Sequence, residues 1–96
     1  MFIAFDPAGI PRLEDADNFR AFKVVYPTSL SGKRTVLSAV GRFDEAGYLW
    51  VERAWLEENS PRDAGWQKGF DAMVTYAATL GWVDDVGSIR AHIEQQ

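Results

Sequence analysis

The sequence predicts an α+β fold: a small antiparallel β-sheet of three to five strands, made of two hairpins, followed by two C-terminal helices packed on one face. Two observations predict this class. Runs of β-forming residues joined by short turns fill the first half of the chain, and an amphipathic helical pattern fills much of the second. Strands first and helices last is typical of segregated α+β folds, whereas parallel βαβ sheets alternate the two. The length of 96 residues indicates a single domain, 1–96.

Residues 2–13 are expected to form the first hairpin. Phe2–Phe5 is a short apolar run, and Asp6-Pro7-Ala8-Gly9 follows with Asp, Pro and Gly at the first, second and fourth positions of a type I turn. A glycine at that position can take the positive φ that lets the chain re-enter a strand. Since Pro11 cannot donate a ladder hydrogen bond, the returning strand is expected to be very short or to lie at a sheet edge.

The second hairpin is expected around Asp44-Glu45-Ala46-Gly47. The flanking segments Thr35–Phe43 and Tyr48–Val51 are rich in β-formers, and Gly41 inside the first segment indicates a bulge or a close backbone approach. Both turns read F-D-x-A-G followed by a bulky residue. The similarity ends after about six residues, so it indicates shared turn chemistry rather than a duplicated domain.

The connection between the hairpins is ambiguous over residues 14–26. Asp15 or Asp17 is placed to cap a helical turn over residues 18–22, and residues 22–26 then form a strand. Residues 28–33 are expected to be a loop, because Thr, Ser and Gly dominate them.

A long helix is expected over residues 61–80. Ser60 is suited to the N-cap, and the proline that follows it is suited to the first helical position. Gly81 then supplies the left-handed residue that ends the helix. Apolar residues recur at helical spacing along one face and are expected to form half of the core: Trp66, Phe70, Met73, Ala77 and Leu80.

Two further helices complete the expected fold. Residues 52–58 favour a short helix, because they are mostly good helix formers. Asp84 or Asp85 is expected to cap a last helix with an apolar side made of Val86, Ile89 and Ile93. Within the long helix, Gly69 is explained by a close approach of the sheet or of another helix.

Composition excludes several functional classes. Hydrophobic residues at 47% and aromatic residues at 14% exclude a disordered chain. The net charge of −4 disfavours binding to the phosphate backbone of a nucleic acid, so no nucleic-acid partner is expected. No stretch of about 20 apolar residues is present, so no membrane partner is expected. The N-terminus lacks the features of a signal peptide, which predicts a cytoplasmic location.

The sequence offers few groups for metal binding or catalysis. There is no cysteine, and His92 is the one histidine. A zinc site needs three or four suitable ligands, so neither a metal nor a cofactor is expected. His92 is interpreted as a residue in the last turn of the terminal helix, where its charge complements the helix dipole. Ser31–Thr35 lacks the glycine and hydroxyl spacing of a phosphate-binding loop, and no G-x-S-x-G turn occurs. No catalytic residue is therefore assigned.

The number of aromatic residues is the one feature of the composition that is unusual for a chain of this length. Four tryptophans are many for this length, and they are Trp50, Trp55, Trp66 and Trp82. Either all four belong to the core, or some lie on a sheet face that the helices leave uncovered. Tryptophan is enriched at binding hot spots, and an exposed apolar patch usually marks an interface. We therefore expect a non-catalytic domain that acts by association, as a homodimer or with a protein partner. Trp50 and Trp55 are the candidate association surface.

The alternative is a small-molecule-binding protein or small enzyme. Its pocket would lie between the sheet and the helices, as a concave apolar cleft with a few converging polar groups. Four residues would supply those groups: Arg42, Tyr48, Arg53 and His92.

Overall fold

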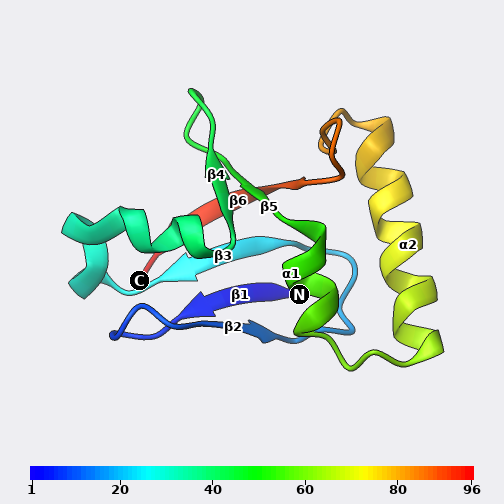
Figure 1. Ribbon diagram of the computed structural model, residues 1–96, viewed down its shortest axis with the longest axis horizontal. Coiled ribbons are helices and arrows are strands. Elements are labelled where there is room, and N and C mark those ends of the chain that lie inside the picture. Colours follow the sequence, from blue (N-terminus) through cyan, green and yellow to red (C-terminus); the bar gives the residue numbers. More distant parts are fainter.

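A computed structural model describes all residues, 1–96, and gives an α+β fold of six strands and three helices (Figure 1). In chain order the elements are β1 (Phe2–Phe5), β2 (Pro11–Glu14), β3 (Lys23–Tyr26), the 3-10 helix η1 (Thr28–Ala39), β4 (Gly41–Phe43), β5 (Leu49–Val51), α1 (Arg53–Glu58), α2 (Ala64–Thr79) and β6 (Ile89–Gln95). The predicted class is confirmed, but the chain ends on a strand rather than on two helices.

The strands form one mixed and strongly curled sheet in the order β2-β1-β3-β6-β5-β4. The β1–β2, β4–β5 and β5–β6 pairs are antiparallel, whereas β1–β3 and β3–β6 are parallel. The prediction of a purely antiparallel sheet is therefore wrong. The reason is β6, which inserts between the two hairpins and runs parallel to β3.

The predicted terminal helix is wrong because residues 89–95 follow a period of two. Ile89 and Ala91 are buried, while Arg90 and His92, which alternate with them, point to the other face. Val86, which was expected on the apolar side of that helix, is 82% exposed. His92 therefore lies on a strand, and the interaction predicted for it with a helix dipole does not exist.

Three turns share one geometry. At Asp6, Asp44 and Asp84, one carboxylate oxygen accepts hydrogen bonds from the backbone N–H groups two and four residues later. The glycine at the fourth position has a φ of +83°, +90° or +85°, at Gly9, Gly47 and Gly87 respectively. The first two hairpin turns are as predicted. The third turn precedes β6 and was not recognised in the sequence.

Residues 28–43 differ from the prediction. The expected loop and the first half of the expected strand form η1 instead, because Leu30 and Leu37 are both buried in the core. Only Gly41–Phe43 remains as a strand. A side chain at Gly41 would collide with the carbonyl oxygen of Trp50, so the predicted close backbone approach is confirmed.

The long helix starts later than predicted. It spans Ala64–Thr79, and its N-cap is Asp63 rather than Ser60. The Asp63 carboxylate accepts a hydrogen bond from the backbone N–H of Trp66 at 2.6 Å. Arg62 has a φ of +61°, which a continuing helix does not allow.

The apolar face of α2 agrees in part with the predicted stripe. Met73 is half-buried, and Leu80 is 43% exposed, because it lies beyond the last helical residue. Gly81 has a φ of +77° and ends the helix as expected. The buried residues of the helix are Trp66, Phe70, Val74 and Ala77.

All three helices contribute to one core on one face of the sheet. Leu56 of α1, Leu37 of η1 and Phe70 of α2 are buried with the inward-facing residues of β1, β3, β5 and β6. α2 stands along one end of the strands, and η1 lies at the opposite end (Figure 1). The short helix and the strand at residues 22–26 are confirmed as α1 and β3, whereas residues 18–22 form turns and no helix.

Candidate functional site

The main candidate site is a pocket of about 310 Å³ between the C-terminal half of α2, residues 19–22 and the start of β6. We call it the aromatic pocket. Its lining is mostly apolar and includes five aromatic rings besides the histidine: Phe19, Arg20, Ala21, Phe22, Tyr48, Met73, Tyr76, Ala77, Trp82, Ile89, Arg90 and His92. A pocket of this size is at the lower end of the range for small-molecule sites.

The pocket arises from the staggered pairing of β6. Residues 89–91 pair with β5, but β6 meets β3 only from His92 onward. The β3 side of residues 89–91 therefore has no strand neighbour. The connection over residues 19–22 borders this gap, and α2 covers it from the end of the sheet.

The N-terminal amine holds the connection that forms one wall. The Met1 ammonium donates hydrogen bonds to the carbonyl oxygens of Asn18 at 2.7 Å and Ala21 at 3.2 Å. Burial lowers the pKa of this amine, and Asp15 and Asp17 oppose that shift. These bonds fix the two ends of the segment that carries Phe19 and Arg20.

A glycine on α2 shapes the same wall. The Phe19 ring lies directly over Gly69, where a Cβ atom would collide with it. The predicted close approach at Gly69 is therefore real, but a side chain from a connecting segment makes it, not the sheet or a helix. Phe19 also lies against Trp66, with ring centroids 6.1 Å apart. Gly69 thus allows Phe19 to reach both the helix and the pocket.

Arg90 is the most distinctive polar group of the aromatic pocket. Its guanidinium carbon lies 4.2 Å from the ring centroid of Tyr48 and 5.3 Å from that of Trp82. Neither Arg90 nor Arg20 takes part in any of the ion pairs or side-chain hydrogen bonds of the molecule. The pocket therefore presents positive charge that no carboxylate neutralises.

The four residues proposed from the sequence as pocket groups do not meet in one place. Tyr48 and His92 line the aromatic pocket, whereas Arg42 and Arg53 line a second hollow of about 350 Å³ beside Trp50. Arg42 pairs with the Asp84 carboxylate.

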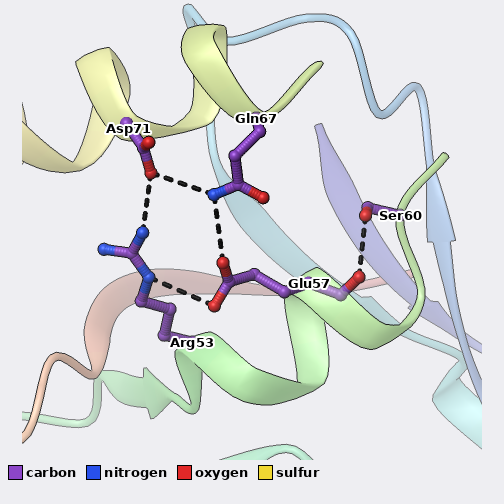
Figure 2. Close-up of polar contacts among 5 residues, drawn as sticks. All are labelled: Arg53, Glu57, Ser60, Gln67 and Asp71. Carbon is purple, nitrogen blue, oxygen red and sulfur yellow. Dashed lines mark hydrogen bonds and ion pairs between the residues drawn. The ribbon is translucent and has the colours of Figure 1, made fainter. Parts of the chain in front are cut away.

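Figure 2 shows that Arg53 belongs to a polar clamp between two helices, formed by Arg53, Glu57, Gln67 and Asp71. Arg53 donates from Nε to Glu57 at 3.2 Å and from Nη2 to Asp71 at 2.6 Å. Gln67 Nε2 donates to both carboxylates at 3.0 Å, and Ser60 Oγ donates to the Glu57 carbonyl at 2.7 Å. The guanidinium of Arg53 is thus occupied in joining α1 to α2.

The two tryptophans proposed as an association surface are both half-buried. The indole N–H of Trp50 donates to Asp44 Oδ2 at 2.8 Å, and this bond is the main reason that the pKa of Asp44 is lowered. Trp55 on α1 packs against the core. The more exposed aromatic side chains are Tyr76 at 66% and Trp82 at 38%.

The polar side chains in the lining of the aromatic pocket are those of arginine, histidine, tyrosine and tryptophan. Its lining contains no carboxylate, serine, threonine or lysine. The closest carboxylate oxygen to His92 belongs to Glu94, at 3.8 Å. Ser88 precedes His92 by four residues of extended chain, about 13 Å. No group of three potential metal ligands lies together, and no helix is long and apolar enough to cross a membrane.

Sequence reasoning missed Arg20, Arg90, Tyr76 and Trp82 as members of one site. The alternation after residue 88 was the available signal, because a strand there places Arg90 and His92 on the same face. Nothing local to the sequence places residues 19–22 beside them. Comparisons of the chain with protein-family models, curated proteins and solved structures found no match.

Proposed function

We propose that this domain is a binding module whose aromatic pocket takes a small aromatic ligand. The observation that carries the proposal is the pocket itself, a concave space of about 310 Å³ lined by aromatic and aliphatic side chains. Aromatic and apolar walls with a few polar groups are typical of small-molecule sites. Stacking against Tyr76 and burial beside Met73 would supply most of the binding energy.

The lining supports binding rather than catalysis. A general acid–base mechanism usually needs a pair of acid and base groups or an oriented base, and His92 is the one histidine in a lining without carboxylates. No serine, threonine, lysine or carboxylate lines the pocket to work with it as a nucleophile. The rigid elements on both sides, α2 and β6, suit a preformed site.

A neutral fluorescent probe tests the proposal. N-phenyl-1-naphthylamine is expected to bind saturably, at one molecule per chain, with increased fluorescence on leaving water. Ala21 is exposed and lines the pocket, so Ala21→Trp is expected to fill the mouth and abolish binding. Ala72→Trp is the matched control, because Ala72 is exposed on α2 and does not line the pocket.

The proposal fails if the probe does not saturate. It also fails if Ala21→Trp and Ala72→Trp bind the probe equally well while both remain folded by circular dichroism.

Association is the second candidate function, and the end of α2 favours it. Tyr76 and Leu80 are one helical turn apart and are 66% and 43% exposed, and Trp82 follows at 38%. Exposed apolar side chains gathered at one place are typical of interfaces. Because Trp50 and Trp55 are half-buried, they would contribute less surface than these three residues.

Sedimentation equilibrium tests association. A homodimer would appear as twice the chain mass of 10.8 kDa at micromolar concentration, and Trp82→Glu would restore the monomer without unfolding it. A mass of 10.8 kDa that persists to high micromolar concentration would remove this candidate.

A further inference from the structure

We infer that the ligand of the aromatic pocket is an aromatic monocarboxylate, with its carboxylate bound by the guanidinium of Arg90 and with Arg20 and His92 at the same mouth. This inference rests on the proposed function and adds the chemical class of the ligand. It follows from the charge of the pocket, the packing of Arg90 and the position of α2.

The charge of the pocket contrasts with that of the whole chain. The protein carries a net charge of −4, yet the lining contains two arginines and a histidine and no acidic residue. Glu94, whose carboxylate lies 3.8 Å from His92 Nε2, pairs with Lys23 at 3.0 Å, and Asp84 pairs with Arg42. A bound anion would therefore reach Arg90 and Arg20 without displacing an internal carboxylate.

The packing of Arg90 prepares it for a carboxylate. Its guanidinium lies over the rings of Tyr48 and Trp82, and its backbone N–H donates to the Trp82 carbonyl at 2.9 Å. Stacking restricts the planar group without using its N–H donors. Those donors form a fork that matches the two oxygens of a carboxylate. Little conformational entropy is then lost when the anion binds.

The aromatic rings could also attract a cation, but Arg90 already occupies the faces of Tyr48 and Trp82. A cationic ligand would have to compete with it and would find no carboxylate in the lining. The pocket therefore favours an anion over a cation.

A single negative charge fits better than a phosphate dianion. Met73, Tyr76 and Ala77 bring the C-terminal half of α2 to the pocket, and this end of a helix carries partial negative charge. Phosphate sites usually use a helix N-terminus, and that of α2 lies at Ala64, away from the lining. The carboxylate is therefore expected on the β6 side, with the aromatic ring of the ligand against Met73 and Ile89.

Three probes of the same shape and different charge test the inference: phenylacetate, phenylacetamide and phenethylamine. Dissociation constants are measured by titration of backbone amide NMR shifts, with the Arg90 and Trp82 signals as markers. Phenylacetate is expected to bind about tenfold or more tightly than phenylacetamide, because hydrogen bonds between charged groups are stronger than neutral ones. Phenethylamine is expected to bind most weakly.

Arg90→Gln is expected to remove the preference for phenylacetate over phenylacetamide. Arg12→Gln is the matched control, because Arg12 lies on the edge strand β2 and outside the pocket, and it should keep the preference. Arg90→Lys retains the charge but not the planar fork, so an intermediate preference is expected. This variant also provides the test if the glutamine variant does not fold.

The outcomes separate the two proposals. If phenylacetamide or phenethylamine binds as tightly as phenylacetate, the carboxylate inference is overturned and the aromatic pocket remains a binding site. A preference that Arg90→Gln and Arg90→Lys both leave unchanged also overturns it. If none of the three probes shifts the signals of the pocket, the proposed function fails as well.

Discussion

Four of the seven arginines of this protein fall into two contrasting regions. Arg53 in the polar clamp and Arg42 beside Asp84 are both paired with carboxylates. Arg90 and Arg20 in the aromatic pocket have no such partner. An arginine whose donors are satisfied internally holds elements of the fold together, whereas one whose donors are free can serve a ligand. Arg34 and Arg62 also have no ion-pair partner, so it is the place of Arg90 and Arg20 in the aromatic pocket that marks them as candidates for ligand binding.

Removing Phe70 would disturb the core beneath the polar clamp and should give the largest effect. Its ring stacks on Trp66 at 4.7 Å between centroids, and the Arg53 guanidinium lies 5.2 Å above it. Because Phe70 is fully buried, Phe70→Ala is expected to lower the free energy of unfolding by about 3–5 kcal/mol. Denaturant titration measures this, with Tyr76→Ala on the exposed face of α2 as the control. A loss below about 1 kcal/mol would contradict the role of Phe70 in the core.

The pH dependence of stability tests the contribution of Asp84, the partner of Arg42. Burial acts to raise its pKa, but hydrogen bonds from the Ser88 and Val86 N–H groups and from Arg42 outweigh burial and lower the pKa. A lowered folded-state pKa gives stability that is present above the unfolded pKa of about 3.9 and is lost as the pH falls through the folded value. Asp84→Ala is expected to cost about 1–3 kcal/mol at neutral pH. Asp84→Asn, which keeps the turn acceptor, should cost less.

Urea titrations across pH 2–7 check this expectation. Both Asp84 variants should show a flatter decline in stability at acid pH than the unmodified protein. An identical acid limb in all three proteins would show that Asp84 does not link folding to protonation.

The polar clamp should contribute a smaller amount. Arg53 and Asp71 are partly exposed, at 36% and 53%, so water screens their attraction. A double-mutant cycle with Arg53→Gln and Asp71→Asn is expected to give a coupling energy of about 0.2–1 kcal/mol. A coupling of zero would remove the clamp as the link between α1 and α2. Phenylacetate binding should be unaffected in both single variants.

Arg20 should give the smallest effect on stability and sharpens the contrast most directly. It is exposed and has no ion-pair partner, so Arg20→Gln is expected to change the free energy of unfolding by less than about 0.5 kcal/mol. The same variant should weaken phenylacetate binding, and the weakening should shrink at high salt as charge is screened. A variant that lost stability but bound phenylacetate normally would place Arg20 among the structural arginines.

Local chemistry made much of the fold predictable. The turns at Asp6 and Asp44 were recognisable because a side-chain acceptor and a glycine with positive φ occupy fixed positions. The turn at Asp84 follows the same rule but was interpreted as a helix cap, since Asp is suited to both roles. The alternation of Ile89 and Ala91 with charged neighbours was the signal that distinguishes the two.

The candidate site was less predictable than the fold. Most of its residues come from the connection before β3, from α2 and from β6, and the pairing of β3 with β6 brings them together. That pairing joins residues about 70 positions apart, and no local pattern indicates it. Tyr48 and His92 were proposed for their chemistry alone, and it was the sheet register that placed them next to Arg90.

The central place of β6 also governs how the chain can fold. β2-β1-β3 and β5-β4 are two local units, and they become one sheet only when β6 pairs with both. The Lys23–Glu94 contact spans 71 residues. Closing the sheet therefore costs a large amount of chain entropy before the stabilising contacts between β3 and β6 have formed. Topologies of this kind fold slowly. Until β6 docks, β3 and β5 expose open edges that can pair with other molecules. Docking of β6 is therefore the folding step that protects this chain from aggregation during refolding.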